Sequence, residues 1–271
     1  MSASASEAGD VVAGPSVASR LFAILDAFTT PTLARALSLT EISQRAGLPL
    51  STTHRMVAEW THWGGLTRLE DGRYSLGLRL WEIGVQTPTA RNLRTLALPY
   101  LEDLYEATRE HVHLAILDAR DALYVEKLSG HQAVHVISRV GGRLPLHATG
   151  VGLVLLAFAP PDLQAEYLAS KLTRFTPATV TDPELLRRRL AEIRATGVAS
   201  MSEEMTPGSS SLAAPIRDRT GQVVAAVSVV TRTLAVQDPE QDAAVRTAAR
   251  GISRTLGYRR AEKKDPEVGF H

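Results

Sequence analysis

Hydrophobic residues near the start of the chain recur with the spacing of an α-helix. After Ser16, apolar side chains return every three or four positions as far as Phe28, which places them on one face of a helix. Ser16 is suited to cap the first turn, because its hydroxyl can accept a backbone N–H that has no partner inside the helix. Pro31 is predicted to end this helix, since proline is not tolerated in a helix interior.

Two further helical patterns follow. The second helix is predicted to begin with Thr40 as its N-cap and to end at Gly47, where glycine readily adopts the left-handed conformation. The third helix is predicted over 52–63, with Ser51 as its N-cap. Its apolar side chains fall on one face and its polar side chains on the others, so one side is expected to pack against a core.

A short hairpin comes after the third helix. Residues 66–69 and 73–76 read as two strands, and the Asp71-Gly72 pair between them is a dipeptide that tight turns prefer. Two short helices separated by a turn and followed by a hairpin are typical of a winged helix-turn-helix. We therefore predict such a domain over residues 16–77, preceded by a disordered arm at 1–15.

From residue 78 onward the pattern alternates between helices and strands. A helical linker is predicted over 78–91, and a long amphipathic helix, bent near Pro99, follows it. Helices flanking an antiparallel sheet make residues 92–258 an α+β domain, and the tail 259–271 is predicted to be disordered. The predicted strands are 111–119, 121–129, 133–139, 211–217 and 223–230, and the predicted helices are 92–109, 148–158, 161–170, 183–196 and 239–257.

Composition narrows the possible chemistry. The 271 residues include no cysteine, which excludes disulfides, thiolate catalysis and cysteine-based zinc sites. No apolar run is long enough to cross a bilayer and the first residues lack the features of a signal peptide, so we expect a cytoplasmic protein. The net charge is +1. Any affinity for nucleic acid therefore has to come from a local surface.

Three stretches of the chain resemble the isocitrate-lyase-regulator (IclR) family of bacterial transcription factors. They are LTEISQRAGLPLSTTHRMV with EDGRYSLG, GGRLPLHATGVGLVLLA, and SLAAPIRDRTGQVVAAVSV. The resemblance implies a GAF-like effector domain behind the DNA-binding domain. It also implies a homo-oligomer, a dimer or a tetramer, that binds palindromic double-stranded operators and whose DNA binding responds to a small-molecule effector.

The third predicted helix carries the main candidate DNA contacts. Ser51 and Thr52 lie at its N-terminus, where hydroxyls and backbone N–H groups can bind phosphate, and Arg55 can form two hydrogen bonds with a guanine edge. The alternative is that Ser51 only caps the helix and Arg55 is an ordinary solvated side chain. Leu50 stands where many family members carry a basic residue. The predicted DNA contacts are Arg20, Thr40, Ser51, Thr52, His54, Arg55 and Arg73.

The candidate effector site lies around the second of these stretches. Its helix begins with Gly150 and Val151, whose backbone N–H groups can face an anionic or carbonyl ligand; alternatively, the glycines only permit close packing. The resemblance places two serines on the last strand, but this chain has only Ser228, with Val230 at the other position. Such a pocket favours an aromatic or acyl compound over a two-carbon acid. The predicted effector contacts are Leu144, Gly150, Val151, Ser211, Ser228 and Val230.

Other chemistry has less support in the sequence. His147 with Ser209–Ser211 lacks the surroundings of a hydrolase nucleophile. His111 and His113 share one face of a strand, but no carboxylate stands at ligand spacing, so we predict neither a metal nor a cofactor. We predict no catalytic residue and no enzymatic activity. The alternatives are a GAF-like small-molecule enzyme and a sensor that acts through protein partners.

Overall fold

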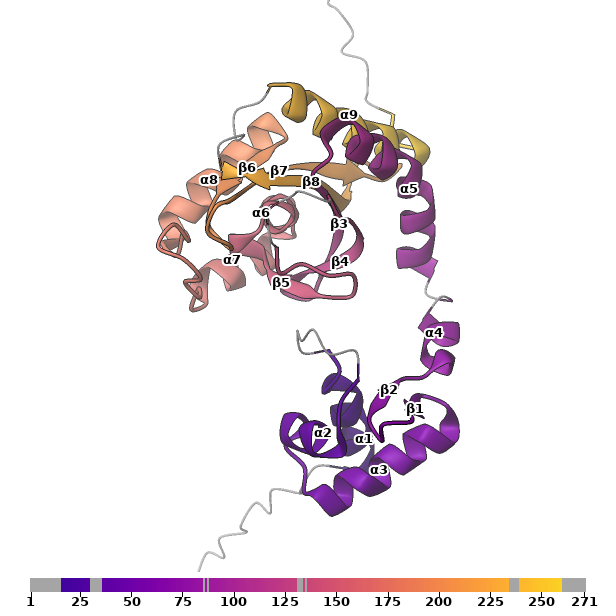
Figure 1. Cartoon of the computed structure of the whole chain (residues 1–271). Helices are drawn as coiled ribbons and strands as arrows, with labels where there is room; N and C mark the ends of the chain where they lie inside the picture. Colours follow the sequence, from indigo (N-terminus) through magenta and orange to yellow (C-terminus); the bar gives the residue numbers. More distant parts are fainter. Residues whose placement is uncertain are drawn as a thin grey trace, which may run out of the picture. The chain divides into compact units, whose positions relative to one another are not determined.

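A computed structural model of the chain divides into two compact units, Met1–Pro88 and Thr89–His271 (Figure 1). The predicted arm, Pro31 and most of the predicted tail lie outside the described residues. Within the described part of the chain, no helix is both long and apolar enough to cross a bilayer. The structure describes residues 16–29, 36–84, 86, 88–130, 134, 136–233 and 239–259.

The first unit packs three helices around a small apolar core and adds a hairpin and a fourth helix. Ile24, Ile42 and Val57, one from each of the first three helices, are almost fully buried together with Leu37 and Leu66. This arrangement confirms the predicted helix-turn-helix with a wing. The elements are α1 (Val17–Asp26), α2 (Leu39–Ala46), α3 (Leu50–Trp63), β1 (Leu66–Arg68), β2 (Tyr74–Leu76) and α4 (Leu78–Gly84).

The start of α2 differs from the prediction, because Ser38 and not Thr40 is its N-cap. The Ser38 hydroxyl accepts the backbone N–H of Glu41 at 3.2 Å, and the Glu41 carboxylate accepts the backbone N–H of Ser38 at 2.8 Å. This reciprocal pair needs a spacing of three residues, which Ser38 has and Thr40 lacks. At the other end, Gly47 has φ +64° and closes the helix as predicted.

The start of α3 also differs from the prediction. The helix begins at Leu50 with Pro49 at the cap position, and no side chain caps it. Ser51 therefore lies inside the first turn, and its predicted role as N-cap is wrong. Proline suits this position because its φ of −57° matches the approach to a helix and the N–H that it lacks would have no partner there.

The second unit is a six-stranded antiparallel sheet with helices on both faces, which confirms the predicted α+β architecture (Figure 1). The strand order is β5-β4-β3-β8-β7-β6. Helices α6, α7 and α8 pack on one face, and α5 and α9 on the other. The elements are α5 (Pro88–Thr108), β3 (His111–Asp118), β4 (Asp121–Leu128), β5 (Arg143–Pro145), the 3-10 turn η1 (Leu146–Ala148), α6 (Gly150–Ala157), α7 (Pro161–Ala169), α8 (Pro183–Thr196), β6 (Ala199–Ser202), β7 (Ser209–Arg217), β8 (Val223–Arg232) and α9 (Pro239–Thr255).

Small side chains let α6 lie close to the sheet. All eight residues of α6 are buried. Ala115, Ala213 and Ala226, from three neighbouring strands, form the surface on which the helix rests. A Cβ atom on Gly150 would lie 2.5 Å from the Ser211 hydroxyl oxygen, closer than real Cβ atoms come. Glycine at the first position of α6 is therefore required by this contact.

One predicted strand of the sheet is wrong, and two strands, β5 and β6, were missed. Of residues 133–139, the described ones form no strand, and β5 at Arg143–Pro145 takes the edge position beside β4 instead. Val136 and Ile137 of that segment line a cavity, so their apolar side chains have a place to pack without strand pairing. The missed strands β5 and β6 have three and four residues, too few for an alternation to be recognised.

Candidate nucleic-acid interface and ligand pocket

Helix α3 presents a polar face that the core of the first unit leaves free. Thr53, Met56 and Val57 are buried against the core, whereas His54 and Arg55 are exposed. Arg55 makes no hydrogen bond or ion pair with any described residue. Its guanidinium, with five N–H donors, is therefore free to bind an acceptor outside the chain.

The remaining predicted DNA contacts are spread over other elements. Arg20 lies on α1 and is partly buried, whereas Thr40 lies exposed in the first turn of α2. Arg73 lies on the hairpin, where its side-chain Nε donates to Asp71 at 2.8 Å. Hydrogen bonds from Arg73 hold the pKa of the Asp71 carboxyl below its usual range. Because Asp71 offsets part of the Arg73 charge, Arg73 is expected to be a weaker phosphate ligand than an unpaired arginine.

In the second unit, a cavity opens beside the N-terminus of α6. The structure brings all the predicted effector contacts to this cavity, from β5, α6, β7 and β8. The predicted residues that line it are Leu144, Gly150, Val151, Ser211, Ser228 and Val230. The sequence analysis missed most of the remaining lining, which is His113, Tyr124, Val136, Ile137, Ser138, Ala148, Thr149, Met201, Met205, Thr206, Ser209 and Ser210.

The floor of the cavity is a patch of the sheet in which polar and apolar side chains mix. Ser211 on β7 pairs with Val230 on β8, and the next inward-facing residue of β8, Ser228, pairs with His113 on β3. The lining thus carries more hydroxyl groups than the two serines, Ser211 and Ser228, that were predicted. Three consecutive serines, 209–211, were the one sequence signal that could have shown this.

His113 is a neutral hydrogen-bonding group of the cavity. Burial is the largest cause that lowers its pKa to about 3, with smaller effects from Lys127 and His111. Its Nε2 atom lies 2.8 Å from the Ser138 hydroxyl. At physiological pH the imidazole therefore carries no charge. The His113–Ser138 pair thus offers a neutral ring nitrogen and a hydroxyl in the cavity lining.

Side chains of β3 and β4 hold the segment that carries Ser138. His111 Nε2 lies 2.7 Å from the Val134 carbonyl oxygen, and the Lys127 ammonium donates to the Ser138 carbonyl oxygen at 2.8 Å. These bonds stand in for the strand pairing that was predicted there. They place Val136, Ile137 and Ser138 along one wall of the cavity.

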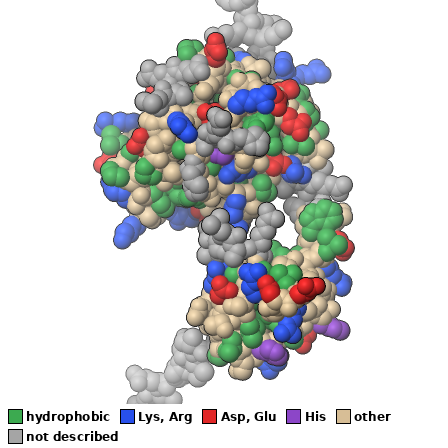
Figure 2. Space-filling view, viewed as in Figure 1, with side chains coloured by type: hydrophobic (Ala, Val, Ile, Leu, Met, Phe, Trp, Pro, Cys, Tyr) green, Lys and Arg blue, Asp and Glu red, His purple; other side chains and the backbone are tan. Residues whose placement is uncertain are grey.

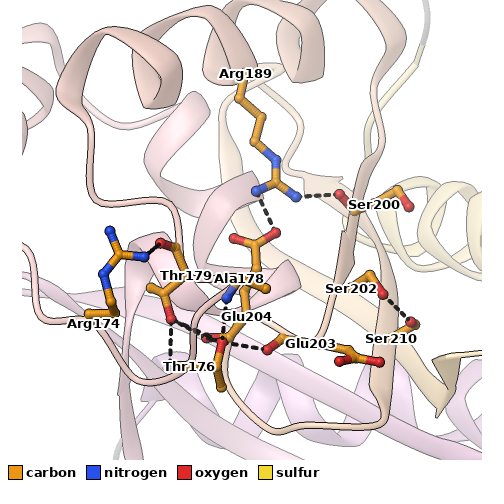
Figure 3. A network of polar contacts seen from close by, with 10 residues as sticks. All are labelled: Arg174, Thr176, Ala178, Thr179, Arg189, Ser200, Ser202, Glu203, Glu204 and Ser210. Atoms are coloured by element: carbon orange, nitrogen blue, oxygen red, sulfur yellow. Dashed lines mark hydrogen bonds and ion pairs between the residues drawn. The ribbon is translucent and has the colours of Figure 1, made fainter.

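A second wall comes from the connection between β6 and β7, which a buried polar network anchors (Figure 3). The Glu204 carboxylate, 5% exposed as a residue, accepts a hydrogen bond from Arg189 of α8 at 2.6 Å. The Thr179 hydroxyl donates to the Glu204 backbone oxygen at 2.7 Å. Burial raises the pKa of Glu204, while Arg189 opposes that shift. The next residues, Met205 and Thr206, line the cavity.

His147 does not join the serines as a catalytic partner would. Its Nε2 bonds the Thr173 carbonyl oxygen at 2.9 Å, so Nε2 carries the proton and Nδ1 accepts from the Tyr167 hydroxyl at 2.8 Å. Burial lowers the pKa of His147, which favours the neutral ring. Both nitrogens are therefore used in holding the fold. Among the described residues, no three His, Asp or Glu side chains are grouped as metal ligands would be.

Two family models match the chain. Residues 17–70 match the IclR helix-turn-helix domain, and residues 85–254 match the C-terminal domain of the bacterial transcriptional regulator IclR. The chain is 36% identical over 244 residues to the HTH-type transcriptional regulator XynR of Escherichia coli, an alignment that covers 88% of this chain and 96% of that protein. It is 32% identical to E. coli KdgR, over 88% of this chain and 92% of that regulator.

Solved structures agree with these matches. An IclR homolog from Microbacterium hydrocarbonoxydans, complexed with 4-hydroxybenzoate, is 40% identical and superposes with a TM-score of 0.82, covering 89% of this chain and 99% of that one. The Thermotoga maritima IclR is 32% identical with a TM-score of 0.71, covering 88% and 98%. Both likenesses extend through the helix-turn-helix and the sheet domain.

The buried network predicts a large cost for Arg189→Ala. Removing the guanidinium leaves the Glu204 carboxylate buried without its partner, so we expect a loss of about 3 kcal/mol in the free energy of unfolding, measured by urea denaturation. Arg187→Ala is the matched control, because Arg187 lies on the same helix and pairs with Glu184 in solvent. That change is expected to cost less than about 0.5 kcal/mol. Equal losses for the two variants would contradict the role given to Glu204.

Proposed function

The chain belongs to the IclR family of bacterial transcriptional regulators, and we propose that it binds a palindromic operator as a dimer or tetramer whose affinity an aromatic acid controls. The family supplies an N-terminal DNA-binding domain and a C-terminal effector-binding domain. The relatives are named as transcriptional regulators, not as enzymes. We assign DNA binding to residues 16–77 and effector binding to residues 92–258, joined by the linker 78–91.

Helix α3 is the proposed reading element. Its exposed residues His54 and Arg55 follow a first turn that contains Ser51 and Thr52, so phosphate contacts and base contacts can come from neighbouring turns. Among the described residues, Arg55 has no partner that it would have to give up on binding DNA. The hairpin residue Arg73 and the α1 residue Arg20 are proposed to contact the DNA backbone or the minor groove.

One observation carries the effector proposal: the N-terminus of α6 and a serine-lined strand meet at a cavity with apolar walls. The backbone N–H groups at the start of a helix and the Ser211 hydroxyl suit a carboxylate. Leu144, Val151 and Ile137 suit a ring. A structural relative that superposes over most of the chain is complexed with 4-hydroxybenzoate, which has both parts. We therefore propose an aromatic carboxylate as the effector.

The size of the cavity links ligand binding to a change of shape. Its volume is about 50 Å³, whereas a cavity that takes up benzene measures roughly 150 Å³. A ring can enter only if part of the wall moves, and Met201 and Met205 have flexible side chains that can adapt. Ligand binding and displacement of this wall are thus the same event, which gives the ligand different affinities for two states of the domain.

A second copy of the chain is proposed to cover α4. This helix has seven residues and buries none of its side chains. Leu78 and Trp81 are 68% and 64% exposed, and Figure 2 shows hydrophobic side chains gathered over α4. A helix this short is marginal in water without tertiary packing. Two recognition helices held by such a contact could read half-sites about one turn of DNA apart.

The DNA-binding proposal predicts different effects for two arginines. Arg55→Ala should cost about 1–3 kcal/mol on the operator and relax the preference at one base position in each half-site. Arg73→Ala should weaken all sequences alike and reduce the salt dependence by at most about one unit of slope. Electrophoretic shifts with operator and random DNA, at several salt concentrations, measure both. An Arg55→Ala variant that lost equal affinity for both DNAs would show that Arg55 does not read bases.

The oligomer proposal predicts that Trp81→Glu weakens self-association at least tenfold. A charge placed in an apolar contact would have to be desolvated without a partner when two copies meet. Sedimentation velocity at micromolar concentration measures the change, and Glu82→Gln on the same helix is the control expected to associate normally. A wild-type protein that remained monomeric with and without operator would defeat this proposal.

The effector proposal predicts that Ser228→Leu removes the response to ligand. Ser228 is buried in the cavity floor, so a leucine there would fill the cavity and leave the fold of the DNA-binding domain unchanged. Operator affinity without ligand is expected to stay within about twofold, because sensing and reading are coupled only through the equilibrium between states. Ser228→Ala is the control that keeps the space open and the response intact. Operator titrations with and without an aromatic acid chosen by thermal shift decide the matter; an unchanged response in Ser228→Leu would place the site elsewhere.

A further inference from the structure

We propose that the effector pocket has two polar ends, and that the His113–Ser138 pair recognises a neutral hydroxyl on the ligand at the end opposite its carboxylate. This inference rests on the proposed function, because it specifies which aromatic acids the same pocket accepts. It assigns to His113 and Ser138 a role in specificity that the sequence did not indicate. The predicted effector contacts lie on the other strands and on α6.

The first polar end lies over β7. The α6 N-terminus sits directly on Ser211, as the 2.5 Å approach of a Cβ on Gly150 to the Ser211 hydroxyl oxygen shows. Ser209 and Ser210, from the start of the same strand, also line the cavity. The Ser211 hydroxyl and the first turn of α6 thus meet at one place. This is where a carboxylate gains most from the helix dipole and from hydrogen bonds. The Ser209 and Ser210 hydroxyls already donate to the Thr206 carbonyl oxygen and to Ser202, so Ser211 is the hydroxyl proposed to donate to the ligand.

The second polar end lies two strands away, over β3. Here the His113 ring nitrogen and the Ser138 hydroxyl are 2.8 Å apart, and both residues line the cavity. His113 is 2% exposed and Ser138 is 7% exposed, so the pair is buried and fixed in position. The Lys127 ammonium donates to the backbone oxygen of Ser138 and is not part of the cavity lining.

The strand register sets the separation of the two ends. Ser211 lies on β7 and His113 on β3, with β8 between them. Two strand spacings amount to about 10 Å, and His113 is displaced from the level of Ser211 by one inward-facing position, about 7 Å along the strands. A benzene ring with polar groups on opposite (para) carbons, together with one hydrogen bond at each end, can span the distance between Ser211 and His113. A hydroxyl at the meta position would point away from the line that joins these two residues.

Charge decides which group the second end accepts. The His113 ring is neutral, because burial lowers its pKa to about 3. A hydroxyl can both donate and accept, so it suits the His113–Ser138 pair whichever of the two atoms donates within it. A second carboxylate would lose its hydration without meeting a cation in the lining. The pocket therefore favours a para-hydroxylated monocarboxylate over a dicarboxylate of the same shape.

Calorimetric titration of the full chain with four probes tests the inference. The probes are 4-hydroxybenzoate, 3-hydroxybenzoate, benzoate and benzene-1,4-dicarboxylate. The wild type is expected to bind 4-hydroxybenzoate about tenfold or more tightly than the other three, since leaving a buried polar pair unmatched is costly. In Ser138→Ala the preference for 4-hydroxybenzoate over benzoate should fall to within about twofold, while Ser138→Thr, which keeps the hydroxyl, should retain it.

Ser211→Ala is the matched control at the carboxylate end. It should weaken benzoate and 4-hydroxybenzoate by the same factor, because both carry the carboxylate that Ser211 is proposed to bind. Benzoate binding with no preference for the para-hydroxyl, or a preference that survives in Ser138→Ala with an unchanged melting temperature, would overturn this inference alone. Failure of the wild type to bind any of the four probes would overturn the proposed aromatic effector and this inference with it.

Discussion

The close packing of α6 on the sheet is the constraint on which the sensing domain depends. The helix is buried on every side, so it needs a surface of small residues below it, and Ala115, Ala213 and Ala226 provide one. Gly150 continues this contact to the helix N-terminus, where Ser211 lies beneath it. The same close packing brings Gly150 and Val151, at the start of α6, to the lining of the pocket. The packing of the core and the position of the proposed ligand site therefore depend on the same contact.

Two walls of the pocket are held by polar side chains and not by sheet pairing. His111, His113 and Lys127 hold the segment around Ser138, and Arg189 with Glu204 holds the segment around Met205 (Figure 3). A few hydrogen bonds can hold a segment in one position, although each contributes little net free energy to stability. Such weak anchoring of the wall around Met205 agrees with the proposed widening of the cavity when a ring enters it.

Much of the architecture could be predicted from the sequence, because local signals there agree with one another. The apolar face of α3, the left-handed Gly47 and the Asp71-Gly72 turn each require only their near neighbours. Predictions went wrong where two local signals compete. Thr40 and Ser38 are both good N-caps, and only the reciprocal bond with Glu41 selects Ser38. Likewise, Val136 and Ile137 have the pattern of a strand but line a cavity.

The order of the elements, the class of the two domains and six residues of the pocket lining could be read from the sequence, since each rests on periodicity, on turn chemistry or on resemblance to a family. Which distant residues share the pocket became visible only in the folded chain. His113 and Ser138 are 25 positions apart in the chain. Glu204, which follows β6, binds Arg189 of α8, which lies 15 positions earlier. Such partners carry no local pattern, because their pairing follows from strand register and from the burial of polar groups, and both arise only when the whole chain folds.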